Sequence, residues 1–174
     1  MNYFEFFDLP VAFKIDEAAL KQRFYERSRR YHPDFYTLES DEKQAEILEL
    51  STFNNEAYQT LADFDRRVDY LLRLRGALAE EGQNEIPQDF LMEMMDLNEV
   101  LMELEMDFDA ALYQKALQEL EHHEKTAFEE VAHIIGQYDD KKADPTELSA
   151  VRDFYLKKRY LLRIQENLAK FAPH

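Results

Sequence analysis

Apolar residues recur along most of the chain at the three- and four-residue spacing of amphipathic helices. In residues 17–31, Leu20, Phe24 and Tyr31 fall on one face of such a helix, and Asp16 is a good cap for its first turn. This segment is also basic, with Lys21, Arg23, Arg27, Arg29 and Arg30 against only Glu17 and Glu26. The pattern predicts a basic amphipathic helix over 17–31.

A loop is predicted directly after this helix. Pro33 has no amide hydrogen to donate, and its ring disfavours the α conformation at His32, so the helix ends there. A second amphipathic helix is predicted over 41–62, with apolar positions at Ala45, Leu48, Phe53, Ala57 and Leu61. Shorter helices are predicted over 2–9 and 63–75. The first half of the chain is therefore a helical hairpin whose connecting loop begins with His-Pro-Asp.

Longer helices are predicted in the second half, over 87–105, 108–137 and 145–170. The polar residues 77–86 predict a linker before them, and Pro87 suits the first position of the next helix. Asp144-Pro145-Thr146-Glu147 combines an N-cap, a proline at the first position and an acid at the third. Short turns between these helices predict a three-helix bundle. We expect an N-terminal domain over 1–76, a linker over 77–86 and a C-terminal domain over 87–174.

The helix predicted over 87–105 is apolar over more than the width of one core stripe. At about 100° per residue, one narrow face holds Phe90, Met94, Leu97, Leu101 and Leu104. A second row contains Leu91, Met95 and Met102, with Met92 and several acidic residues just beyond it. Two interpretations remain open. The second row is either buried against a further neighbour, or exposed as a surface for a partner, to which flexible methionine is suited.

Composition and charge narrow the class of protein. Three glycines, five prolines and many good helix formers favour an all-α fold. The absence of cysteine excludes disulfides and a cysteine-ligated iron–sulfur cluster. The net charge of −16, of which −12 lies in residues 77–174, argues against nucleic acid as a partner. With no signal-peptide pattern and no run of about 18 apolar residues, we expect a cytoplasmic protein that does not bind membranes.

The first half resembles the J domain of DnaJ-type co-chaperones in three segments. The aromatic segment 2–10 precedes the basic helix, His32-Pro33-Asp34 follows it, and residues 53–61 read Phe-Asn-Asn-Glu-Ala-Tyr-Gln-Thr-Leu, as in the family's third helix. Phe35 departs from the pattern, since the family often has lysine there. The resemblance implies docking on an ATP-bound chaperone of the HscA or DnaK type and stimulation of its ATPase. The residues that it implies for this contact are His32, Pro33, Asp34, Lys21, Arg23, Arg27 and Arg30.

The whole chain is similar to the HscB family of J-type co-chaperones, which act in iron–sulfur cluster biogenesis. The segment 90–99, Phe-Leu-Met-Glu-Met-Met-Asp-Leu-Asn-Glu, resembles that family's Phe-Leu-Met-Glu segment, and a DnaJ-like Gly/Phe-rich region and zinc-finger cysteines are missing. The resemblance implies that the C-terminal domain delivers an IscU-type scaffold protein to the chaperone. The residues implied for scaffold binding are Leu91, Met92, Met95, Asp96, Glu99, Glu103 and Leu156.

No catalytic, metal or cofactor site is predicted. Glu119-x-x-His122 and Glu130-x-x-His133 have the spacing of di-iron bundles, but they lie about 16 Å apart along one predicted helix and therefore do not share a metal. No phosphate-binding loop or activated nucleophile occurs, so an enzyme is not expected. A J-domain adaptor for a different client remains the alternative. A purely structural coiled-coil protein would leave the loop and the basic cluster unexplained.

Overall fold

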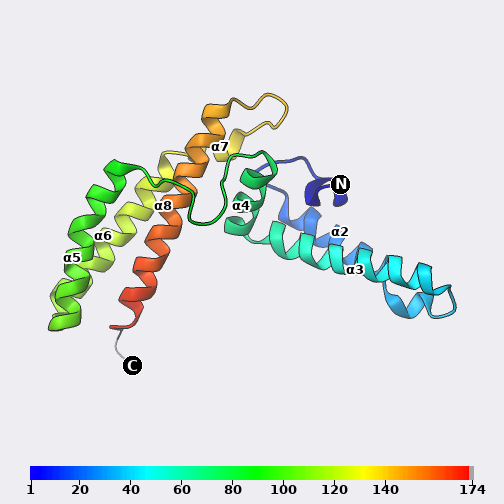
Figure 1. Cartoon of the computed structure of the whole chain (residues 1–174), viewed down its shortest axis with the longest axis horizontal. Helices are drawn as coiled ribbons and strands as arrows, with labels where there is room; N and C mark the ends of the chain where they lie inside the picture. The colour runs from blue at the N-terminus through cyan, green and yellow to red at the C-terminus, as the bar shows by residue number, and fades with distance from the viewer. Residues whose placement is uncertain (173–174) are drawn as a thin grey trace. The chain divides into compact units, whose positions relative to one another are not determined.

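The computed structural model describes residues 1–172, and all regular structure within that range is helical. The helices are α1 (Tyr3–Phe6), α2 (Glu17–Arg30), the 3-10 helix η1 (Pro33–Tyr36), α3 (Asp41–Ala62), α4 (Phe64–Leu74), α5 (Gln88–Met106), α6 (Ala110–Glu129), α7 (Ala132–Gln137) and α8 (Pro145–Ala169) (Figure 1). Among these helices, none has the length and apolar character needed to cross a membrane. The predicted all-α fold is confirmed.

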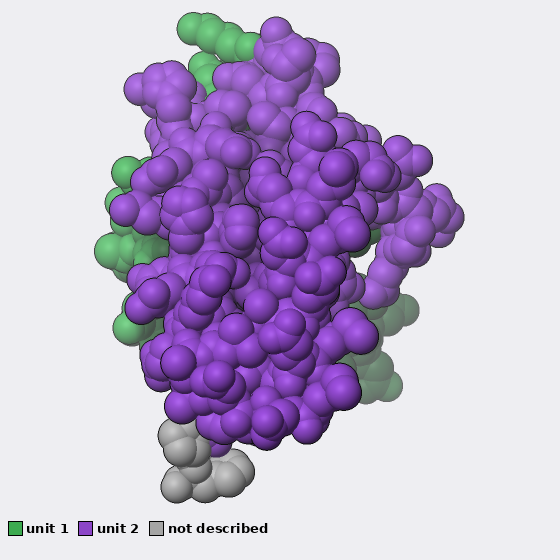
Figure 2. Space-filling view, turned by 90° about the vertical axis from the view of Figure 1, so that its left-hand side faces the viewer, with its two compact units in different colours: residues 1–74, 138–142 green, residues 75–137, 143–174 purple. Residues whose placement is uncertain are grey.

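The chain divides into two compact units (Figure 2). Unit 1 comprises Met1–Leu74 together with the short segment Tyr138–Lys142, and unit 2 comprises Arg75–Gln137 together with the chain from Ala143 onward. Tyr138 belongs to unit 1 because its ring packs edge-on against Phe13, with the centroids 4.8 Å apart. A segment far along the sequence therefore completes the core of the first unit.

In unit 1, α2 and α3 lie side by side and form a hairpin, with η1 in the connection (Figure 1). Asp16 caps α2 by accepting a hydrogen bond from the Ala19 amide at 3.0 Å, and Ser40 caps α3 through the Lys43 amide at 3.2 Å. These caps explain why the predicted starts of both helices agree with the structure.

The buried face of α3 differs from the predicted one. Ile47, Asn54 and Leu61 are buried at seven-residue spacing, whereas Leu48 is 60% exposed and Ala45 is exposed as well. Asn54 is tolerated there because its side-chain amide donates to Ser28 Oγ at 3.0 Å. The prediction that Ala45 and Leu48 belong to the apolar core face was therefore wrong, since the hairpin contact selects the neighbouring row.

Helix α1 is held by partners that lie far along the chain. The Tyr3 amide donates to Tyr70 Oη at 3.0 Å, and the two rings stack with centroids 4.4 Å apart. Tyr3 and Phe6 also pack edge-on against Phe53, at 5.1 and 4.9 Å. A four-residue helix has no stability of its own, so these contacts fix it.

Arg67 of α4 is a charged residue inside the core of unit 1. It is 4% exposed, and its guanidinium donates to the carbonyl oxygen atoms of Phe13, at 2.7 Å, and Leu61. Burial lowers the pKa of this guanidinium, with the charges of Glu17 and Asp63 acting in the opposite direction. The two backbone carbonyl groups therefore supply acceptors for a guanidinium that is buried in the core of unit 1.

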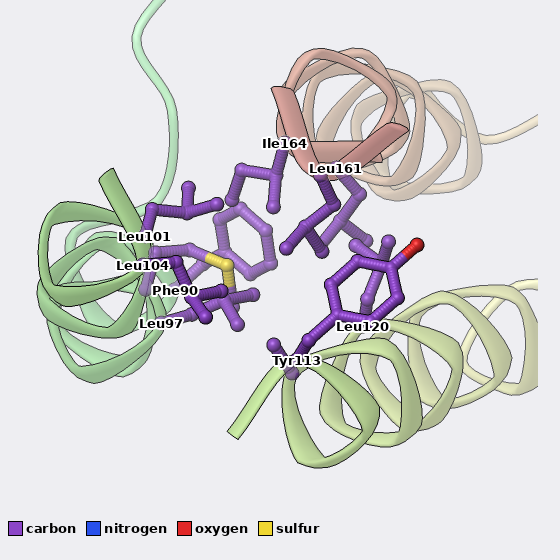
Figure 3. Packing of buried hydrophobic residues seen from close by; sticks show 11 residues of the cluster. Phe90, Leu97, Leu101, Leu104, Tyr113, Leu120, Leu161 and Ile164 are labelled. Carbon is purple, nitrogen blue, oxygen red and sulfur yellow. The ribbon is translucent and has the colours of Figure 1, made fainter. Parts of the chain in front are cut away.

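Unit 2 contains the three-helix bundle of α5, α6 and α8. Figure 3 shows side chains from all three helices pointing into one shared core. The core takes from α5 the five residues that the helical stripe predicted, namely Phe90, Met94, Leu97, Leu101 and Leu104. Pro87 is the N-cap of α5 and not its first residue, a shift of one position from the prediction.

The single helix predicted over 108–137 is two helices. α6 ends at Glu129 and α7 starts at Ala132, with Glu130 and Val131 between them. The Val131 amide donates to the Phe128 carbonyl at 3.1 Å, and this tighter turn leaves both Val131 and Ile135 buried. Burial of these two side chains accounts for the break between α6 and α7, at which the sequence has neither glycine nor proline.

Candidate functional site

The loop between α2 and α3 presents His32, Pro33 and Asp34 at the surface of unit 1. His32 caps η1, since its Nδ1 accepts a hydrogen bond from the Asp34 amide at 3.2 Å. Pro33 occupies the first position of η1, where its fixed φ and missing amide hydrogen cost nothing. The Asp34 side chain is 84% exposed. His32 and Pro33 therefore shape a tight turn, and the carboxylate of Asp34 points away from the core.

His32 lies close to both the backbone and the side chain of Asp34. Its Nδ1 accepts a hydrogen bond from the Asp34 amide at 3.2 Å and lies 3.6 Å from Asp34 Oδ2. The Asp34 side chain remains 84% exposed, so its carboxylate is accessible to an external cation.

Two of the predicted chaperone-binding arginines have partners within unit 1. Arg23 Nη1 donates to the carbonyl oxygen atoms of Phe7 and Asp8, at 2.6 and 2.7 Å. Arg27 Nη2 lies 2.9 Å from Asp8 Oδ2, and its guanidinium sits over the rings of Phe6 and Phe7. Asp8 has a positive φ of 53° that ends α1, so both arginines secure the C-terminal end of that helix.

Lys21 and Arg30 differ from these two arginines, because their side chains are exposed. The guanidinium of Arg30 lies over the Tyr31 ring, 5.5 Å from its centroid. Arg29, which sequence analysis counted in the basic helix but not among the contact residues, is exposed as well. The structure thus brings Arg30 and Arg29 to the end of α2, next to the loop, with their charges accessible.

Three apolar residues beside the loop are exposed, which sequence analysis did not predict. Phe35 is 74% exposed, Leu38 fully exposed and Leu48 60% exposed. A pocket of about 260 Å³ next to them is lined by Pro33, Tyr36, Gln44, Ala45, Ile47 and Leu48. The sequence does contain one indication of this exposure. If Ile47, Asn54 and Leu61, spaced seven residues apart, form the buried row of α3, then Leu48 lies on its outer side.

The second candidate site is the outer face of α5 in unit 2. Met92 and Met95 are 66% and 60% exposed, and Leu91 is half-buried. Asp96, Glu99 and Glu103 are exposed on the same side of the helix. Because the five buried residues of α5 face the other way, this row is free of the core of unit 2. The face offers apolar contact area bordered by negative charge.

Leu156 of α8 lies near the same edge of the bundle. The Asn98 side chain donates to Tyr160 Oη at 2.7 Å, which joins one edge of α5 to one edge of α8. Leu91 lies two turns before Asn98 on that edge, and Leu156 lies one turn before Tyr160, where it is half-buried. Leu156 therefore lies on the side of α8 that carries Tyr160.

In residues 1–172, no three histidine, aspartate or glutamate side chains are grouped as metal ligands. Glu130 lies 3.0 Å from Lys157 Nζ, and His123 lies 3.8 Å from Glu93. The two Glu-x-x-His motifs were predicted on one helix, but Glu119 and His122 lie in α6, whereas His133 lies in α7.

Comparisons with known proteins identify the family of this chain. A family model described as "HSCB C-terminal oligomerisation domain" matches residues 86–169. The co-chaperone protein HscB homolog of Psychromonas ingrahamii is 31% identical over 169 residues, covering 97% of this chain and 95% of that protein. Matches to the homolog of Vibrio cholerae (40% identical) and to the HscB of Proteus mirabilis (38%) span 60% and 64% of those relatives and 58% and 63% of this chain.

Solved structures extend the similarity to the whole fold. The chaperone HscB from Vibrio cholerae superposes with a TM-score of 0.69 at 26% identity, covering 98% of this chain and 97% of that one. Human co-chaperone protein HscB gives a TM-score of 0.74 at 27% identity, covering 97% of this chain and 81% of that one.

Proposed function

This chain belongs to the HscB family of co-chaperones, and from that premise we propose that it stimulates the ATPase of an HscA- or DnaK-type chaperone and delivers an IscU-type iron–sulfur scaffold protein to it. It thereby assists the maturation of iron–sulfur proteins in the cytoplasm. In this role the chain is an adaptor and not an enzyme, and neither a nucleic acid nor a membrane is a partner.

The observation that carries the chaperone half is the exposed carboxylate of Asp34. Its side chain is 84% exposed at the end of a basic helix, and the hydrogen bond of His32 holds the turn beneath it. A carboxylate presented in this way suits an arginine of the ATPase, because that pair forms a directional, charge-assisted hydrogen bond. Pro33 and His32 contribute by holding the turn in a single conformation.

The basic residues divide into two roles within this proposal. Arg30 and Lys21 have exposed side chains, and they steer the J domain toward an acidic surface of the chaperone. Arg23 and Arg27 bind Phe7 and Asp8 at the C-terminal end of α1, so they support the interface indirectly by stabilising the fold of unit 1. Their direct contribution to chaperone binding is correspondingly smaller.

The scaffold half is supported by the outer face of α5. Leu91, Met92 and Met95 supply apolar area that the bundle core does not use, and Leu156 extends it on α8. Asp96, Glu99 and Glu103 border this area and favour a partner with a basic rim. Methionine side chains adapt to irregular partner surfaces, which suits this role.

The test combines ATP hydrolysis with scaffold binding. The chain should raise the steady-state ATPase rate of an HscA-type chaperone, and it should bind an IscU-type scaffold in isothermal titration calorimetry. DnaK measured in parallel identifies the cognate chaperone. ATPase stimulation without scaffold binding would indicate an adaptor for a different client. Absence of stimulation with either chaperone would contradict the proposal.

A further inference from the structure

Helix α5 holds five of the six methionines of the chain. Four of them are well exposed: Met92 at 66%, Met95 at 60%, Met102 at 65% and Met106 at 88%. The fifth, Met94, is fully buried in the bundle core. One helix thus carries four accessible thioethers on one side and one shielded thioether on the other.

The four exposed methionines form a single stripe. At about 100° per residue they span about 80° of the helix circumference, and they extend over about 21 Å of its length. Met94 points about 160° away from Met92. Glu99 lies within this stripe, and Glu103 and Asp96 lie about 20–40° beyond its edge. Any reagent that reaches the proposed scaffold-binding face therefore reaches sulfur atoms, and the core is protected from it.

We propose that Met92 and Met95 are a reversible oxidation site at which peroxide switches off recognition of the partner that binds this face. The inference rests on the proposed scaffold-binding function. The thioether sulfur attacks one oxygen atom of hydrogen peroxide, the O–O bond breaks, and the sulfoxide and one water molecule result. The sulfur is oxidised by two electrons and the peroxide is reduced, so the step is balanced.

The charge of the chain selects the oxidant. The net charge is −16 and carboxylates border the stripe, so an anionic oxidant is repelled, whereas hydrogen peroxide is uncharged at neutral pH.

The polarity of methionine sulfoxide, the product, explains the loss of binding. A sulfoxide is strongly polar, and burying it in an apolar contact removes its hydration without replacing its hydrogen bonds. The fold is retained because Met94 keeps its thioether.

Replacing the two methionines with leucine separates the effect of oxidation from the effect of losing an apolar side chain. Leucine and methionine have similar volume and apolar character, so Met92→Leu/Met95→Leu should remain folded. Because Met92 and Met95 belong to the proposed binding face, the scaffold affinity of this variant before oxidation is its own reference, and the ratio of its affinities before and after oxidation is compared with the same ratio for the wild type. The same variant has no sulfur at either position. Met102→Leu/Met106→Leu is the control, because it removes two thioethers farther along the same stripe, one of similar exposure and one of greater exposure.

The experiment treats the full chain with hydrogen peroxide and follows each methionine by peptide mass spectrometry. Met92 and Met95 should oxidise early, and Met94 should remain reduced while circular dichroism is unchanged. The oxidised wild type and the oxidised control should bind an IscU-type scaffold at least about tenfold more weakly, which is about 1.4 kcal/mol. Methionine sulfoxide reductases A and B should restore binding. The oxidised Met92→Leu/Met95→Leu protein should keep its affinity.

Two outcomes would overturn the inference. Oxidation of Met94 at the rate of Met92 would contradict the site, and equal scaffold affinity before and after oxidation would contradict the switch. Failure of the proposed function is recognised separately, because the reduced wild type would then not bind the scaffold at all. The oxidation pattern itself is measured without any partner. Stimulation of the chaperone ATPase in the absence of scaffold should survive oxidation, since Met92 and Met95 lie outside unit 1.

Discussion

The two units present their candidate surfaces in opposite ways. In unit 1 the surface is a short turn that presents one exposed carboxylate, and the turn is held by one proline and by the hydrogen bond from the Asp34 amide to His32. In unit 2 it is one side of a helix whose other side fills a packed core. A turn concentrates recognition in a single side chain, whereas a helix face spreads it over several. A single substitution should therefore remove the first function, and several are needed to remove the second.

The largest effect is expected from Asp34→Asn, which should abolish stimulation of the chaperone ATPase. The amide cannot form the charged pair with an arginine, and because the side chain is 84% exposed its loss should change stability by less than about 0.5 kcal/mol. ATPase assays and thermal unfolding measure the two quantities. Full stimulation by the folded variant would remove Asp34 from the mechanism. Scaffold binding serves as the control and should be unchanged.

A triple change of Leu91, Met92 and Met95 to alanine should weaken scaffold binding by more than about 1 kcal/mol. The melting temperature should hardly move, because Met92 and Met95 are 66% and 60% exposed. Met94→Ala is the matched control on the same helix, and loss of this buried side chain should cost about 2–5 kcal/mol of stability. Calorimetric titration and urea unfolding distinguish the two faces. A large loss of stability in the triple variant would place its side chains in the core.

Charge reversal should separate the arginines of α2 into two groups. Arg30→Glu should slow association with the chaperone several-fold and leave stability unchanged, since the side chain is exposed. Arg27→Glu should cost about 1–3 kcal/mol of stability, because it removes the pair with Asp8 and places two carboxylates together. Stopped-flow association and urea unfolding measure these effects. Association of the wild type should slow with added salt, which screens charges over about 8 Å at physiological strength.

The smallest effect is expected at the start of α8. Hydrogen bonds from the Thr146 amide and hydroxyl lower the pKa of the Asp144 carboxyl in the folded state. A lowered pKa in the folded state stabilises the protein above the ordinary pKa of aspartate, and this stabilisation is lost as the pH falls through the folded value. Asp144→Ala should therefore lower stability slightly at pH 7 and hardly at all at a pH below the folded-state pKa, in urea unfolding at both pH values. An equal effect at both would exclude the carboxylate as the cause.

Local signals in the sequence predicted most of the fold. α3 was expected over 41–62 and forms over Asp41–Ala62, and α8 starts at Pro145 as its capping box predicts. Both starts depend on residues within one turn, which a sequence pattern contains. The break between α6 and α7 depends on the burial of Val131, and no residue near it indicates that burial. Contacts between helices, which the sequence pattern does not contain, determine the position of this break.

The same distinction applies to the candidate sites. The helical period fixes the angle between the second row of α5 and the core stripe, but it left open whether that row is buried or exposed. The structure leaves Met92 and Met95 exposed. The roles of Arg23 and Arg27 could not be predicted, because their partners at Phe7 and Asp8 lie 15–19 residues earlier and include backbone carbonyls. Arg67 is a stronger case, with an acceptor at Phe13, which lies 54 residues away. Residue type predicts the charge of a side chain, but it does not predict which charged side chains bind other groups within the fold.

The dependence of α1 on Tyr70 has a consequence for synthesis of the chain on the ribosome. The Tyr3 amide and ring find their partner 67 residues later. At about 5–20 residues per second, about 3–13 s pass between the translation of the two tyrosines. A four-residue helix does not hold itself together in that interval. During this interval the aromatic residues at the start of this co-chaperone therefore lack their native partners, and they are exposed apolar groups that favour aggregation.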